Sequence, residues 1–210
     1  MARLGVNIQN LRIGFEKKVF DSNVMKVQAK EIAARSINEA QDAMVESFER
    51  HPVTKEIDGG VDYSGESVVS YFKSDIKANL YSFIGFPKGS DPLKLVRELL
   101  KSRIEVRLST RVKSTYYFKV LAPTKEEIES ATPLPDEYVS GDFSWARAVE
   151  EGDGEALGIG QFLAVRVSAS RSGGGIQVED MSPQSSDVRA TPYITEVLEA
   201  FRKKLQELSL

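Results

Sequence analysis

Residues 103–120, with the sequence RIEVRLSTRVKSTYYFKV, decide the fold. Apolar and polar residues alternate along almost the whole stretch, and no Gly, Pro, Asn or Asp interrupts it. A period of two predicts half-buried β-structure, with one face on a core and the other toward water. The core-facing set is Ile104, Val106, Leu108, Val112, Tyr116, Phe118 and Val120.

The turn within this stretch is open to two interpretations. A two-residue turn at Ser109-Thr110 would mix the two faces. A three-residue loop over 109–111 keeps the faces apart, and so does a single bent strand of about 50 Å at about 3.3 Å per residue. Strands of that length are rare, so we favour two strands.

Amphipathic helices are expected on either side of this β-region. Residues from Val24 to about Arg50 contain no Gly or Pro, which predicts one long helix that stops at His51-Pro52, because the residue before Pro is disfavoured in helical geometry. Its predicted apolar stripe is Val27, Ala34, Ile37, Met44 and Phe48. Thr191-Pro192 opens an amphipathic C-terminal helix. Its predicted apolar face is Ile194, Val197, Leu198, Phe201, Leu205 and Leu208.

Shorter elements are expected between these helices. Residues 53–70 suggest turns, Leu80–Phe86 a buried strand, and Ser90-Asp91-Pro92 the start of a helix. Thr124–Glu127 matches a capping box, which begins a short helix. A second short helix is expected over Phe143–Glu151, with Gly152 at its end.

Two late segments complete the expected fold. Gln161–Ser170 and Ile176–Met181 are predicted to pair as strands. The sum is one α+β domain over 1–210, with a long N-terminal helix, an antiparallel or mixed sheet containing a long hairpin or bent strand, and an amphipathic C-terminal helix. Its expected flexible loops are, approximately, 52–66, 152–160, 171–175 and 182–190.

Composition excludes several function classes. The chain has 210 residues, one His and no Cys. Disulfides, thiolate catalysis and zinc–cysteine sites are therefore impossible, and a poly-histidine metal site is excluded. His51 is expected to cap a helix or face solvent. We expect no enzymatic activity, no metal and no cofactor, and the lack of a signal peptide or membrane segment predicts synthesis in the cytoplasm.

Charge is distributed unevenly along the chain. Residues 97–119 carry seven Lys or Arg against two acids, whereas residues 123–157 carry ten acids against two bases. The strand basic residues share the non-core parity, which fits a solvated face, a surface that meets phosphate, or one that pairs with an acidic neighbour. The candidate DNA-facing residues are Arg103, Arg107, Arg111, Lys113 and Lys119.

Two short motifs lie in the second half of the chain. Trp145 precedes Val149-Glu150-Glu151-Gly152, and Pro192-Tyr193 opens the last helix. With the long N-terminal helix, this layout resembles the tail-completion, or head–tail joining, proteins of tailed bacteriophages. The chain departs from that pattern at Asp153, where the family usually has Thr, and it is longer than a typical member. The family's Pro-x-Thr-Gly is only loosely echoed by Pro52-Val53-Thr54 and Gly59-Gly60.

The resemblance implies a non-enzymatic virion protein located in the neck or tail end. It implies a ring of six or twelve copies around the DNA channel, with portal, adaptor, tail-tube or terminator proteins as neighbours and phage DNA passing without sequence readout. No membrane partner is expected. The candidate interface residues are Trp145, Glu150, Glu151, Asp153 and Tyr193. The alternatives are a tail terminator, or a non-viral module that binds nucleic acid or protein.

Overall fold

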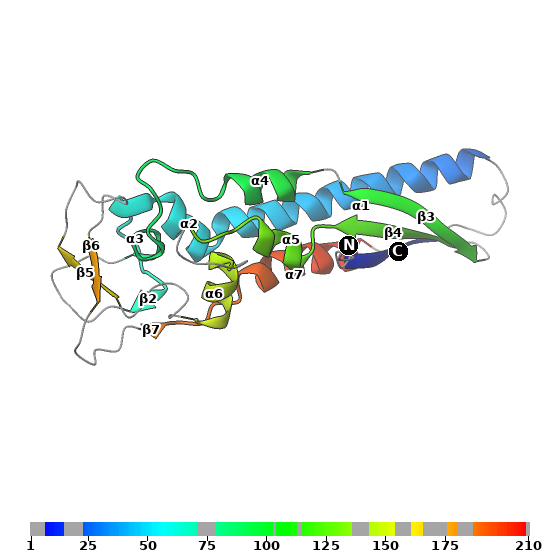
Figure 1. The fold of residues 1–210 in the computed structure, drawn as a ribbon. Helices are drawn as coiled ribbons and strands as arrows, with labels where there is room; N and C mark the ends of the chain where they lie inside the picture. Colours follow the sequence, from blue (N-terminus) through cyan, green and yellow to red (C-terminus); the bar gives the residue numbers. More distant parts are fainter. Residues whose placement is uncertain are drawn as a thin grey trace.

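A computed structural model describes residues 7–14, 23–70, 79–102, 104–112, 115–135, 143–153, 161–165, 176–179 and 187–208. The molecule is elongated, and helix α1 (Asn23–Arg50) runs along much of its length (Figure 1). A three-stranded sheet lies beside the N-terminal half of α1, and the short elements α2, α3, β5 and β6 lie toward the opposite end. The fold class is α+β, as the sequence predicts.

The long helix is confirmed, but its predicted apolar stripe is partly wrong. The buried apolar residues are Met25, Ala29, Ala33, Ile37, Ala40, Met44 and Phe48. Val27 is 54% exposed and Ala34 is also exposed. Most buried positions are four residues apart, and such a stripe rotates by about 40° per step around a helix. A seven-residue spacing predicted Val27 and Ala34 as buried. The buried positions of this part of the helix are instead held by the small residues Ala29 and Ala33.

The chain after α1 forms a helix where turns were expected. Helix α2 (Pro52–Asp58) begins at Pro52, which has no N–H to leave unpaired at this position. His51 caps it, because the Val53 N–H donates to His51 Nδ1 at 3.2 Å. A 3₁₀ turn, η1 (Gly60–Asp62), follows. The prediction of a flexible loop over 52–66 is therefore wrong for its helical part.

Residues 80–84 are also helical rather than extended. Helix α3 (Leu80–Ile84) is buried, as predicted, and ends at Gly85 with φ of 75°. A short apolar run does not distinguish a buried strand from a buried helix. The missed signal was Asn79, whose Oδ1 accepts the Ser82 N–H at 2.9 Å as a helix cap. Helix α4 (Lys94–Lys101) follows Asp91 as predicted, with Pro92 and Leu93 in the turn before it.

The 103–120 stretch forms a hairpin with a turn later than expected. Strand β3 (Glu105–Val112) pairs with β4 (Thr115–Ala122), and Val112 lies opposite Thr115. Leu108 lies opposite Phe118 and Thr110 opposite Tyr117, so Ser109 is the extra residue of a β-bulge. The bulge reverses the predicted parity for the rest of β3, residues 110–112, whereas Tyr116, Phe118 and Val120 of β4 keep the predicted core parity.

The reversed parity corrects two side-chain assignments. Val112 was expected in the core and is 52% exposed. Arg111 was expected on the polar face, but it lies opposite the buried Tyr116, and its guanidinium carbon is 5.8 Å from the centre of that ring.

Strand β1 (Asn7–Gly14) was not predicted and completes the sheet. It pairs antiparallel with β4, so the strand order is β1-β4-β3 and β4 is central. Tyr116, Phe118 and Val120 of β4 point into the core. Ala122 of β4 is buried with them. Tyr117 and Leu121 are half-buried and Lys119 is exposed, as the alternation of a strand predicts.

The remaining short elements largely follow expectation. Helix α5 (Lys125–Ser130) starts with the predicted capping box, and α6 (Trp145–Glu151) ends at Gly152. Strands β5 (Gln161–Val165) and β6 (Ile176–Glu179) pair antiparallel.

The expected late loops are described only in part. Strand β7 (Asp187–Val188) pairs with β2 (Val69–Ser70), so the loop predicted over 182–190 is wrong at those residues. The expected loop residues 154–160, 171–175 and 182–186 lie outside the described residues, as does the predicted strand beyond Val165.

Helix α7 (Tyr193–Glu207) packs along α1 and closes the core. Five of its six predicted apolar residues are buried, and Leu208, just beyond the helix, is half-buried. The core is continuous from α1 through β4, α6 and α7. The long helix and the last helix therefore form the frame on which the sheet and the short helices are held.

Replacing Ala33 by Leu should destabilise the fold, because this position is fully buried on α1. We expect the free energy of unfolding to fall by about 1–3 kcal/mol, as for other overpacked cores. Ala34→Leu is the matched control, since the neighbouring residue is exposed, and its effect should stay within about 0.5 kcal/mol. Urea titrations followed by circular dichroism measure both. Equal losses in the two variants would contradict the assigned buried face.

Candidate functional site

The two motifs that carry the family resemblance meet in space. The rings of Trp145 and Tyr193 are stacked, with centroids 6.0 Å apart and an interplanar angle of 27°. Tyr193 also stacks on Phe48 of α1, and Phe86 meets Trp145 edge to face. We call the contact of α6 with the start of α7, centred on Trp145, Glu150 and Tyr193, the α6–α7 joint.

Glu150 fixes the start of α7 within this joint. Its Oε2 accepts the Ile194 N–H at 3.0 Å, and its Oε1 accepts from the Thr195 hydroxyl and from Lys125 Nζ, the latter at 2.9 Å. Burial alone would raise the pKa of Glu150, but these bonds outweigh it, and the pKa lies below its usual value. A carboxylate at the first turn of a helix also interacts favourably with the helix dipole.

Gly152 allows the chain of α7 to approach α6 closely. Its φ is 71°, and a Cβ at this position would lie 3.1 Å from the backbone nitrogen of Ala190. The Thr191 N–H donates to the Val149 carbonyl at 3.1 Å in the same contact. The Val-Glu-x-Gly element is therefore an internal support for the last helix.

Burial corrects part of the predicted interface. Trp145 and Tyr193 are each 1% exposed, and the Glu150 side chain is 9% exposed, so all three lie within the chain and offer little surface to a second subunit. All three are buried because the α6–α7 joint is built from the two aromatic rings and the Glu150 carboxylate. Glu151 and Asp153 remain exposed.

These two exposed acids belong to a larger acidic surface. It consists of Glu126 and Glu129 of α5, Glu151 of α6, and Asp153. Arg147 lies among them and pairs with Glu151 at 3.0 Å. Burial raises the pKa of Glu129, and the charges of Lys125 and Arg147 oppose this, while Glu126 and Glu151 add to it. We call this group the acidic surface.

Of the predicted basic residues, Arg107 and Lys119 lie on the outward side of the three-stranded sheet. Arg107 lies directly opposite Lys119, and Lys119 lies opposite Asn10 in the register with β1. Arg107 also contacts Glu105 at 2.6 Å. Arg103 and Lys113 lie outside the described residues. The residues of β3 and β4 that share the outward side of the sheet are called the outer face. They are Glu105, Arg107, Thr110, Val112, Thr115, Tyr117, Lys119 and Leu121.

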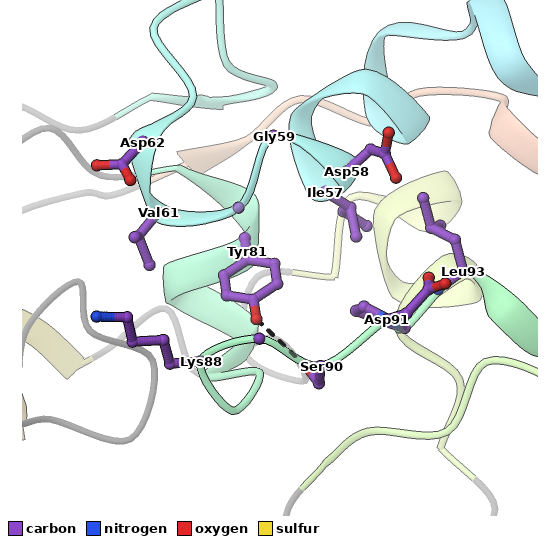
Figure 2. A pocket seen from close by; sticks show the side chains of 13 residues that line it. Ile57, Asp58, Gly59, Val61, Asp62, Tyr81, Lys88, Ser90, Asp91 and Leu93 are labelled. Carbon is purple, nitrogen blue, oxygen red and sulfur yellow. Dashed lines mark hydrogen bonds between the residues drawn. The ribbon is translucent and has the colours of Figure 1, made fainter.

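The described residues also line two hollows, one beside the sheet and one near α2. A groove of about 780 Å³ lies between α1 and β3, with Gln41 and Arg107 among its lining residues. A cavity of about 330 Å³ lies between α2, η1 and the loop before α4. Figure 2 shows Tyr81 pointing toward Ser90 in that cavity; the two hydroxyl oxygens are 3.3 Å apart.

The polar groups of the smaller cavity are largely bonded within the chain. Arg97 of α4 binds both carboxylate oxygens of Glu49 at 3.0 Å and Asp58 Oδ1 at 3.0 Å, and it lies 3.6 Å from Asp91. The hydrogen bonds to Glu49 and Asp58 raise the pKa of Arg97 despite partial burial. The Tyr81 hydroxyl donates to the Pro87 carbonyl. Arg97 pairs with two of the carboxylates that line the cavity, Asp58 and Asp91.

Buried polar residues elsewhere have structural partners. Glu56 is fully buried and accepts from the Ser67 hydroxyl, from the Val68 N–H at 3.0 Å and from the Leu80 N–H at 2.6 Å. Over the described part of the chain, no group of three or more His, Cys, Asp or Glu residues is placed to hold a metal ion.

His51 connects the end of α1 to α7. It is 5% exposed, its ring lies 4.7 Å from that of Tyr193, and its Nε2 is 3.3 Å from Glu196 Oε2. Since Nδ1 accepts the Val53 N–H, the neutral ring holds its proton on Nε2 and donates it to Glu196. Burial lowers the pKa of His51, and the Glu196 carboxylate offsets only part of this.

Glu150→Gln should destabilise the protein, because the amide cannot replace a carboxylate that accepts from a helix start and a lysine. We expect a loss of about 1–3 kcal/mol. Glu151→Gln removes the neighbouring exposed charge and should change stability by no more than about 0.5 kcal/mol. Thermal and urea unfolding at pH 7 compare them. A loss at Glu151 equal to that at Glu150 would contradict the joint.

Stability should fall as the pH drops below the usual His value of 6.5. The unfolded chain binds the proton at that pH, whereas the pKa of folded His51 is lower, so acid favours unfolding until the folded ring also titrates. His51→Asn keeps an acceptor for the helix cap and removes the titration. Urea titrations at pH 7.5 and 5.5 should show a larger loss in the unaltered chain than in this variant.

The acidic surface, the outer face and the α6–α7 joint are the three candidate functional regions of the described residues. No helix among the described residues is long and apolar enough to cross a membrane. Comparisons with family models, curated proteins and solved structures find no match.

Proposed function

We propose that this chain is a structural subunit of the neck or tail end of a tailed bacteriophage, where copies of it form a ring around the DNA channel. The observation that carries the proposal is the α6–α7 joint. Trp145 and Tyr193 are 48 positions apart in the sequence yet stack on each other, and Glu150 binds the N–H that follows Tyr193. The residues of the two motifs therefore belong to one structural unit, as a layout shared by a family implies.

The shape of the molecule supports a role in assembly. The helix α1 and the β3–β4 hairpin extend together to one end, away from the short elements at the other (Figure 1). Val24 and Val27 on α1 and Val112 on the hairpin are each more than half exposed. Apolar side chains exposed at an extended end are a feature of surfaces that other proteins cover.

The hydrogen-bond partners of the buried polar groups support a non-enzymatic role. His51 caps α2, Glu56 binds the N–H that starts α3, and Glu150 binds an N–H of α7. Each has its hydrogen-bonding capacity occupied by the fold itself. A catalytic acid or base would instead be directed into a cleft that a substrate enters.

The outer face suits either of two contacts in such a ring, one with an acidic neighbour and the other, where it lines the channel, with DNA independently of sequence. Arg107 and Lys119 are exposed neighbours, and phosphate contacts from such side chains position DNA without reading its bases. The same face is what a non-viral nucleic-acid-binding module would present. The proposed neighbours remain a portal or adaptor on one side and a tail tube or terminator on the other, with the virion as location and the tail terminator as the nearest alternative role.

The purified full-length chain tests the proposal. We expect light scattering after size exclusion to give a species of six or twelve chains of 23.3 kDa, about 140 or 280 kDa, and negative-stain images to show annular particles. The control is a parallel titration with random-sequence duplex DNA at two salt concentrations. A monomer at every protein concentration that binds this DNA with strong salt dependence would instead favour the nucleic-acid-binding module.

A further inference from the structure

The outer face is open over its central rows. Its outward residues on β3 and Lys119 on β4 are exposed, while Tyr117 and Leu121 beside them are half-buried. An antiparallel sheet can keep one face in water, but a face that mixes apolar and charged residues also suits a protein partner. Tyr117 and Leu121 supply apolar area between the charges.

The charges of the outer face are not balanced within it. Arg107 and Lys119 lie directly opposite each other, and like charges in such a pair destabilise a sheet. Glu105 offsets Arg107 at 2.6 Å. Among the described side chains of this face, the two basic residues therefore outnumber the one acid.

The acidic surface has the opposite imbalance. Glu129, Glu151 and Asp153 interact with the charge of Arg147, and Glu126 lies close to Glu129. Lys125 also lies near Glu129, but it is paired with Glu150. Phe143, at the start of the same helix region, is 50% exposed, and its backbone carbonyl accepts the Leu134 N–H, which fixes its position. An exposed aromatic side chain beside a charged rim is typical of the anchor of a protein–protein contact.

We propose that the outer face of one copy binds the acidic surface of a second copy. Carboxylates of the second copy would lie against Arg107 and Lys119, and Phe143 would cover the apolar area at Tyr117 and Leu121. The contact relieves the like-charge repulsion within both surfaces. The inference deepens the proposed function, because two different surfaces make a heterologous contact, and such contacts close into rings when the rotation permits.

Strand addition at the β3 edge is a weaker way for a second copy to bind there. The bulge at Ser109 interrupts the edge, and exposed charged residues flank it at Glu105, Arg107 and Arg111. Bulges and charges are the devices that keep sheet edges from pairing with other chains. The sheet therefore offers its face rather than its edge.

The absence of cysteine allows a direct test of the contact. Lys119→Cys and Glu126→Cys each introduce the one thiol of the chain, on the outer face and the acidic surface respectively. With a short bismaleimide, we expect cross-linked dimers when the two variants are mixed and at least fivefold fewer with either alone. Leu95→Cys, on exposed α4, is the control. A mixture no better than this control, or Lys119→Cys dimers as abundant as the mixed ones, would overturn the proposal.

A charge exchange tests the same contact without a cross-linker. The double variants R107E/K119E and E126K/E151K should each associate at least tenfold more weakly than the unaltered chain, because each carries two surfaces of one sign. Mixed in equal amounts they should associate again, since each then meets a partner of opposite sign. Melting curves confirm that both variants fold. Unchanged association of either double variant alone, or no recovery of association on mixing, would overturn the contact.

The outcomes separate this contact from the proposed function. Rings that form without mixed cross-links would preserve the neck role and overturn the assigned surfaces. Mixed cross-links with restored association, but only open chains or dimers in images, would preserve the contact and overturn the ring. Duplex DNA that protects Lys119→Cys from labelling, with no mixed dimers, would assign the outer face to DNA instead.

Discussion

The stacking of Trp145 on Tyr193 is the contact on which the arrangement of the chain depends. It joins a seven-residue helix, too short to be stable alone, to the helix that closes the core. Phe48 and His51 extend the contact to the end of α1, and the Tyr193 hydroxyl meets Thr54 Oγ1 of α2 at 2.9 Å. Burial raises the pKa of Tyr193, so the hydroxyl stays protonated and bonded. Four helices are thus fixed by one cluster.

Around this cluster, polar groups act mainly as helix caps. His51, Asn79, Thr124 and Ser144 each accept an N–H at the start of a helix, and Glu150 does so for α7. Unpaired N–H groups at buried helix ends would cost free energy. A fold made of several short helices therefore needs many such acceptors, which explains why four of the ten buried polar residues of the described chain lie at helix starts.

Much of this fold could be predicted from residue patterns, and the failures have physical causes. The caps at Thr124 and Gly152 and the periodicity of α7 were local signals, and they were confirmed. The bulge at Ser109 has no local signal, so the positions of Arg111 and Val112 were predicted wrongly. Strand β1 depends on pairing with β4, over 100 residues away. Trp145 and Tyr193 were predicted as interface residues, because their sequence could not show that they face each other inside the chain.

The α6–α7 joint also gives the protein an optical signal of its own. Trp145 is the one tryptophan in the chain, and it is buried against a tyrosine ring at the point where four helices meet. Its fluorescence emission therefore reports on this cluster alone, without any attached dye. A shift of that emission to longer wavelength would record the loosening of α7 from α6, while an unchanged spectrum during assembly would show that copies join through surfaces that leave this interior intact.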